Sequence, residues 1–128
     1  MDTNDSLFDR ARQSIPGGVN SPVRAFGSVG GSPRFMARAN GCHMWDVDGK
    51  RYIDMGTGIG VTAFGYADEA WQAAVTAQLG AVQHTSNLYY TEPCAKLAQL
   101  LCERTGMKKV FFSNSGAESN ECAIKVAR

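Results

Sequence analysis

The amino-acid sequence predicts an α/β fold in which short antiparallel strands precede alternating helices and a strand. Between residues 34 and 54, Asn-Gly and Asp-Gly pairs separate short runs of strand-forming residues. From Tyr66 onward the apolar residues recur at the spacing of helices. The length of 128 residues and the hydrophobic content of 44% are typical of one soluble domain or part of one.

A short helix is expected at about residues 4–14, followed by an irregular loop. Residues 16–33 are dense in glycine, proline and serine, which interrupt regular backbone hydrogen bonding. A loop of this length either lines a site or is a disordered linker, and composition alone leaves both alternatives open.

Turn chemistry predicts three antiparallel strands after this loop. The expected strands are Arg34–Ala39, Cys42–Val47 and Arg51–Asp54. Asn40-Gly41 and Asp48-Gly49 separate them, and such pairs adopt the positive backbone angles of tight hairpin turns.

Helices alternate with one strand in the remainder of the sequence. Asp68 can cap a first helix, and Thr91 can cap a second that tolerates Pro93 in its first turn and ends at Gly106. The apolar face of the first helix consists of Trp71, Ala74, Val75 and Leu79. The apolar run Lys108–Ser113 is predicted as a strand, and a third helix begins at Ser115.

One strand between helices cannot form the core of a sheet, because a parallel strand needs partners through crossover connections. The third helix also keeps its apolar pattern to Arg128. We therefore expect this chain to be the N-terminal portion of a longer α/β protein.

Composition excludes several classes of function. Thirteen basic and twelve acidic residues leave a net charge of +1, which predicts no binding of nucleic acid or anionic membrane. No apolar stretch approaches the ~20 residues of a membrane span, and the polar N-terminus does not resemble a secretory signal, so a cytoplasmic protein is expected. The four cysteines lack C-x-x-C spacing, which predicts neither a metal site nor a disulfide scaffold.

The segment 108–128 is the most informative for function. An apolar run leads through Ser115, Gly116 and Ala117 directly into a helix, whose free N–H groups form a cradle for phosphate. Ser115 and Glu118 also have the spacing of a capping box, which satisfies such N–H groups without a ligand. The residues alone leave both interpretations open.

The stretch from Gly56 to Arg128 resembles the class-III aminotransferases that depend on pyridoxal 5'-phosphate, in particular acetylornithine aminotransferase. The runs GIGV, HTSNLYYTEP and VFFSNSGAESNECAIKVAR carry this resemblance. It implies a fold-type-I transferase in which Ser115, Gly116 and Ala117 bind the cofactor phosphate. It also places residues 84–90 near the dimer interface and the mouth of the active site, whereas ordinary loop packing is the alternative for this segment.

The runs IPGGVNSPVRAF (15–26) and WDVDGKRYID (45–54) look like glutamate-1-semialdehyde aminomutase, a member of the same class. This resemblance implies that Ser21 and Arg24 approach the substrate carboxylate, to which a guanidinium can donate two parallel hydrogen bonds. By composition alone, Arg24 would be an exposed loop charge. Both enzymes act on a five-carbon semialdehyde or amine derived from glutamate, so this substrate class is expected.

The resemblance also implies the domain organisation. Residues 1–55 would form the N-terminal helix, the substrate-side loop and the antiparallel strands, and residues 56–128 would begin the cofactor-binding large domain, in a homodimer. The family's Schiff-base lysine matches no lysine in this sequence and is expected beyond residue 128, so no catalytic residue is assigned and this chain alone should be inactive. The alternatives are a non-catalytic truncated or hybrid fragment and a small phosphate-binding module.

Overall fold

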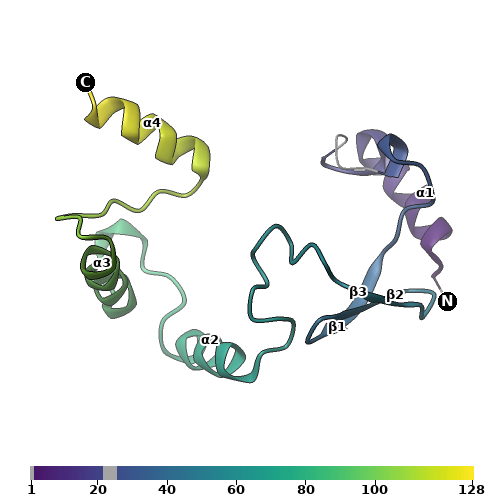
Figure 1. The fold of residues 1–128 in the computed structure, drawn as a ribbon, viewed down its shortest axis with the longest axis horizontal. Coiled ribbons are helices and arrows are strands. Elements are labelled where there is room, and N and C mark those ends of the chain that lie inside the picture. Colours follow the sequence, from purple (N-terminus) through teal and green to yellow (C-terminus); the bar gives the residue numbers. More distant parts are fainter. Residues whose placement is uncertain (1, 22–25) are drawn as a thin grey trace. The chain divides into compact units, whose positions relative to one another are not determined.

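A computed structural model describes residues 2–21 and 26–128 (Figure 1). The chain forms two compact units, Met1–Gly80 and Ala81–Arg128. The boundary between domains near residue 55, which follows from the family resemblance, stays a prediction.

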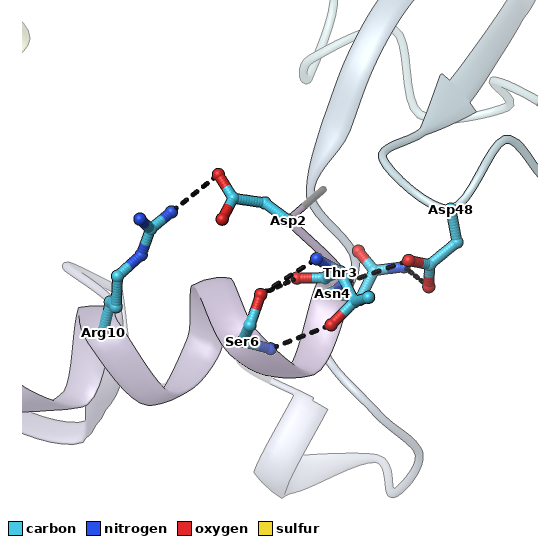
Figure 2. Close-up of polar contacts among 6 residues, drawn as sticks. All are labelled: Asp2, Thr3, Asn4, Ser6, Arg10 and Asp48. Atoms are coloured by element: carbon cyan, nitrogen blue, oxygen red, sulfur yellow. Dashed lines mark hydrogen bonds and ion pairs between the residues drawn. The ribbon is translucent and has the colours of Figure 1, made fainter.

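The first unit begins with helix α1 (Asn4–Ser14), in agreement with the expected 4–14. Thr3 caps it through a capping box, in which the Thr3 hydroxyl accepts from the Ser6 N–H and the Ser6 hydroxyl accepts from the Thr3 N–H. Figure 2 shows both contacts at the start of the helix. A 3₁₀ turn, η1 (Pro16–Gly18), follows, and a second one, η3 (Phe26–Ser28), lies after residues 22–25.

Three antiparallel strands form a sheet in the order β1-β2-β3, as the turn chemistry predicts. They are β1 (Met36–Asn40), β2 (His43–Asp46) and β3 (Arg51–Ile53). Gly41 and Gly49 at the two turns have φ values of +54° and +85°, which is the reason that glycine stands at these positions.

A connection without regular structure joins β3 to the next helix and folds back onto the sheet. The backbone groups of Gly41 and Tyr66 form two hydrogen bonds of 2.9 and 2.8 Å. A Cβ atom on Gly65 would lie 3.0 Å from the Gly41 carbonyl oxygen, so a side chain there would crowd this contact. The connection is therefore held close to the first hairpin turn.

Helix α2 (Glu69–Ala81) begins after Asp68, whose carboxylate accepts from the Trp71 N–H at 2.7 Å, as predicted for its cap. A 3₁₀ turn, η4 (Ser86–Leu88), precedes helix α3 (Glu92–Thr105). The predicted side-chain cap at Thr91 was wrong, because its hydroxyl makes no capping hydrogen bond, although its extended backbone stands at the N-cap. Gly106 ends the helix in the left-handed conformation, as expected.

Helix α4 (Gly116–Val126) follows Ser115, but the predicted strand at 108–113 is absent from the structure. The described residues of the second unit offer no neighbouring strand with which this run could pair. Backbone hydrogen bonds to a partner define a strand, so an unpaired apolar run stays irregular.

None of the described apolar side chains is buried. Trp71, for which core packing is the default expectation, is 60% exposed on α2. The buried side chains are instead the polar Asn4 and Asp46, each 2% exposed. Among the described residues, no helix has the length and apolar character needed to cross a membrane.

Candidate functional site

The predicted phosphate turn lies at the N-terminus of α4. Ser115 stands at the N-cap with extended backbone (φ −148°, ψ 162°), and its hydroxyl accepts from the Glu118 N–H at 3.3 Å. The hydroxyls of Ser113 and Ser119 contact each other, and both approach the Ser115 carbonyl oxygen (3.4 and 3.1 Å). These contacts fix the backbone immediately before the helix.

The alternative interpretation, a regular capping box, is only half realised. A regular box requires the Glu118 carboxylate to accept from the Ser115 N–H. Here the carboxylate accepts from the Asn114 N–H instead, at 2.7 Å. In the part of the chain that the structure describes, the N–H groups of Ser115, Gly116 and Ala117 therefore have no hydrogen-bond acceptor.

Gly116 has no structural reason within this chain to be glycine. Its φ is not positive, and a Cβ atom added to it would meet nothing within 4 Å. Glycine is ~1 kcal/mol less favourable than alanine in a helix interior, and Gly116 is the first residue of α4. The cost is explained if a ligand approaches this backbone closely, and three free N–H groups at the positive end of a helix favour an anion.

Lys125, which lies near this turn in the sequence, forms an ion pair on the helix surface. The Lys125 ammonium pairs with the Glu121 carboxylate at 2.6 Å, one turn away on the exposed surface of α4. An anion bound at this turn would therefore depend on backbone N–H groups and the helix dipole.

Of the two predicted substrate contacts, Ser21 lies in the first unit and is exposed at the end of the segment after η1. Arg24 lies outside the described residues. The predicted phosphate turn belongs to the second unit.

The segment 84–90 lines a groove in the second unit. Its apolar side chains are not packed on the described residues, since Leu88 is 81% exposed and Tyr89 is 71% exposed. The groove is lined by Thr85, Ser86, Asn87, Tyr89, Tyr90, Thr91, Cys94, Ala95, Ala98, Val110 and Phe112. The place of this segment near the dimer interface and the alternative of ordinary loop packing both stay predictions.

Sequence reasoning missed a strained turn after β3. Thr57 and Ile59 have φ values of +48° and +61°, which are rare for β-branched residues. The Asp54 carboxylate holds this turn, because one of its oxygens accepts from the N–H groups of Gly56 and Thr57 at 2.8 and 3.0 Å. The sequence signal was weak, because only the glycines of the run GTGIG indicate a turn.

The second oxygen of Asp54 accepts from the Tyr66 hydroxyl at 2.8 Å. This hydrogen bond and the Gly56 N–H lower the pKa of Asp54, and they outweigh the opposite effect of burial. The same contact, together with burial, raises the pKa of Tyr66. The pair therefore keeps its present protonation state, carboxylate and phenol, across neutral pH.

The four cysteines carry free thiols. Within residues 2–21 and 26–128, no group of three or more histidine, cysteine, aspartate or glutamate side chains is arranged to hold a metal ion.

The architecture matches solved transaminases. An omega-transaminase from Sphaerobacter thermophilus is 33% identical with a TM-score of 0.85, over 99% of this chain and 28% of that one. The predicted fold class, a portion of the α/β fold-type-I transferases, is thereby confirmed. Residues 26–128 match the aminotransferase class-III family, and the chain belongs to that family.

Two curated relatives agree with the two predicted resemblances. An acetylornithine aminotransferase from Haemophilus ducreyi is 56% identical over 93 residues, which are 73% of this chain and 24% of that protein. A glutamate-1-semialdehyde 2,1-aminomutase from Bordetella avium is 47% identical over 130 residues, which cover 100% of this chain and 30% of that protein. The chain thus spans less than a third of the length of either relative.

Proposed function

We propose that the full-length protein is a pyridoxal-phosphate-dependent aminotransferase or aminomutase that acts on a five-carbon semialdehyde or amine derived from glutamate. The family membership and the two curated relatives support the reaction and the substrate class. The observation that carries the cofactor assignment is the set of unpaired N–H groups at residues 115–117, where a Cβ on Gly116 would meet nothing within 4 Å in the described residues.

In this proposal Ser115, Gly116 and Ala117 hold the phosphate of the cofactor. Their N–H groups donate to the phosphate oxygens, and the dipole of α4 favours the negative charge. When bound, pyridoxal phosphate supplies an electron sink for proton and amino-group movement on the substrate. Within this chain, the role of the turn is to bind and orient.

Ser21 and Arg24 are proposed to bind the substrate carboxylate. A hydroxyl donates one hydrogen bond to a carboxylate, and a guanidinium donates two in parallel, so together they fix the orientation of the substrate. The aminomutase relative matches the chain over its whole length, including this segment. A homodimer in the cytoplasm is part of the same proposal.

The phosphate assignment is tested by Gly116→Val in the full-length protein. The new side chain would occupy the space of the anion, so we expect the affinity for pyridoxal phosphate to fall at least about tenfold, the equivalent of ~1.4 kcal/mol. Equilibrium dialysis or the absorbance of the bound cofactor measures this. Gly80→Val is the matched control, because Gly80 is also a helical glycine at which an added Cβ would meet nothing within 4 Å. Unchanged affinity in Gly116→Val would contradict the assignment.

The reaction type is decided by the need for a second substrate. An aminotransferase passes the amino group to a second molecule, whereas an aminomutase returns it to the same carbon skeleton. Turnover of glutamate-1-semialdehyde by the holoenzyme without an added acceptor would favour the aminomutase. Turnover of acetylornithine that requires an added 2-oxo acid would favour the aminotransferase. Failure of both assays would contradict the proposed function.

A further inference from the structure

Asn4 forms several hydrogen bonds, through its side chain and its backbone N–H, to residues far away in the sequence. Its Nδ2 group donates to the Asp48 carboxylate at 2.7 Å and to the Asp46 carboxylate at 3.2 Å. Its Oδ1 atom accepts from the Phe35 N–H at 2.6 Å, and its own backbone N–H donates to Asp48 at 3.2 Å. Asn4 is 2% exposed and its contact with Asp46 is buried, whereas its contacts with Asp48 and Phe35 are part-buried. Figure 2 shows the Asn4 and Asp48 side chains facing each other.

Asn4 lies before one long segment of the chain, residues 15–34, and its partners lie after it. Asn4 begins α1, which leads through η1 to Ser21, whereas Phe35 follows the same segment just before β1. Asp46 and Asp48 belong to the end of β2 and the turn after it. One carboxamide thus ties the chain before and after this segment to the sheet.

The end of α1 is packed against the residues that lead toward Ser21. Gly18 has a φ of +75°, and a Cβ on it would lie 2.7 Å from a ring carbon of Phe8. The Gly18 N–H also donates to the Ile15 carbonyl oxygen at 2.8 Å. Ser21 is three residues further along the chain, so these contacts fix the start of the stretch that leads to Ser21.

The two arms of the segment also share a groove. Its lining includes Gly18 and Val19 from the first arm and Phe26 and Phe35 from the second, with Phe8 of α1. The Phe35 carbonyl oxygen accepts from the Val47 N–H at 2.9 Å, so both backbone groups of Phe35 are fixed. The chain is therefore held to the sheet through Asn4 before the segment and through Phe35 after it.

The acidic partners of Asn4 are themselves part of a satisfied network. The Asp46 carboxylate also accepts from the Tyr52 hydroxyl and the Lys50 N–H, both at 2.8 Å. A buried carboxylate that loses a donor is strongly destabilised, because its charge stays out of water. Asn4 is the donor that joins these carboxylates to α1.

From these contacts we propose that Asn4 is a positioning residue for substrate binding, acting through the segment that carries Ser21. The inference rests on the proposed function, in which Ser21 contacts the substrate carboxylate. In this proposal Asn4 does not contact the substrate. It holds α1, which leads to Ser21, against the sheet.

The test is Asn4→Ala in the full-length holoenzyme. We expect KM for the carboxylate-bearing substrate to rise between about fivefold and a hundredfold, the range that a small misplacement of a binding group produces. kcat at saturation and the absorbance of the bound cofactor should stay as in the wild type. Ser6→Ala is the matched control, since it breaks the capping box of the same helix without touching the sheet. A wild-type KM in Asn4→Ala would overturn the proposal.

A charge exchange keeps the test decisive if Asn4→Ala does not fold. Asn4→Asp places a third carboxylate against Asp46 and Asp48, whereas adding Asp48→Asn supplies an amide that can donate to the new carboxylate and leaves the charge of Asp46 opposite it. We expect the double variant to recover a KM nearer the wild type than Asn4→Asp alone. No recovery would overturn the proposal.

Hydrogen exchange separates this inference from the proposed function. In the full-length protein, amides of residues 15–21 should exchange faster in Asn4→Ala than in the wild type or Ser6→Ala. This readout needs no substrate, so an inactive enzyme that shows the faster exchange would reject the proposed function while supporting the anchoring role of Asn4. Equal exchange in all three proteins would reject the anchoring role itself.

Discussion

At the scale of single residues, a positive φ value is unstrained where glycine has it and strained where a β-branched residue has it. Gly18 combines a φ of +75° with close contact to the Phe8 ring, so both backbone and packing require glycine. Ile59 has a φ of +61° although its side chain is 75% exposed. Only the first position carries the residue that its backbone favours, and the second stores strain.

Gly18→Ala should destabilise the full-length protein by about 2 kcal/mol, because a methyl group adds steric overlap with Phe8 to an unfavourable backbone angle. The free energy of unfolding in urea measures this change. Gly17→Ala is the control: its φ is also positive, at +70°, but a Cβ there meets nothing within 4 Å. Equal losses at the two positions would show that contact with Phe8 contributes nothing.

Ile59→Gly should stabilise the protein by roughly 0.5–1 kcal/mol, because relief of the left-handed strain exceeds the entropy cost of a new glycine. Thermal unfolding of the holoenzyme measures the shift. Val61→Gly is the control, since Val61 is similarly exposed (83%) and its φ is not positive, so it should lose stability. A loss in both variants would mean that the Ile59 side chain is needed for packing.

At the scale of elements, the attachment of α1 to the sheet depends on ionised Asp46. Burial raises the pKa of Asp46. Hydrogen bonds from Tyr52, Lys50 and Asn4, together with the charge of Arg34, lower the pKa by more than burial raises it, so the pKa lies below its ordinary value. A carboxylate whose folded pKa is depressed contributes stability above its unfolded pKa and loses it as pH falls through the folded value.

The difference in stability between the wild type and Asp46→Asn should therefore be largest near neutral pH and shrink below about pH 4, where the unfolded carboxyl takes up its proton. Melting temperatures of both proteins from pH 7 to pH 3 measure it. Tyr52→Phe removes one of the hydrogen bonds that lower the pKa, and it should reduce the acid sensitivity. A difference that stays constant over this range would contradict the role of ionised Asp46.

Elements with local signals could be predicted from the sequence, and those without them could not. The helix at 4–14, the two hairpin turns and the cap at Asp68 follow from residues that lie within a few positions of one another. The run 108–113 has the composition of a strand, but a strand also needs a partner, which composition cannot supply. The contacts of Asn4 join positions 31 to 44 residues apart, and nothing near Asn4 indicates them.

The same distinction applies to the candidate site. Ser115, Gly116 and Ala117 could be named because the run around them is long and specific. Whether the Ser115 N–H is free could not be predicted, because the Glu118 carboxylate can accept from the N–H of either Ser115 or Asn114. The structure shows that it accepts from Asn114. Sequence thus identifies candidate donors, whereas geometry decides whether they are available to a ligand.

At the scale of the whole molecule, none of the described apolar side chains is buried, so the described residues form no core of the kind that stabilises an independent domain. The exposed apolar side chains include Phe111 (73%) beside the phosphate turn and Ile124 (71%) on α4.

Hydrophobic burial is the main term that offsets the conformational entropy of folding, so this 128-residue chain by itself should not unfold cooperatively. We expect it to bind the dye ANS and to lose its helical circular dichroism gradually in urea, whereas the full-length protein should bind little dye and unfold sharply. The polar network around Asn4 would be the most protected part of the isolated chain in hydrogen exchange, because it contains the buried side chains of the described residues. A sharp transition without dye binding would show that the chain covers its own apolar surface, and the cofactor turn could then be studied in isolation.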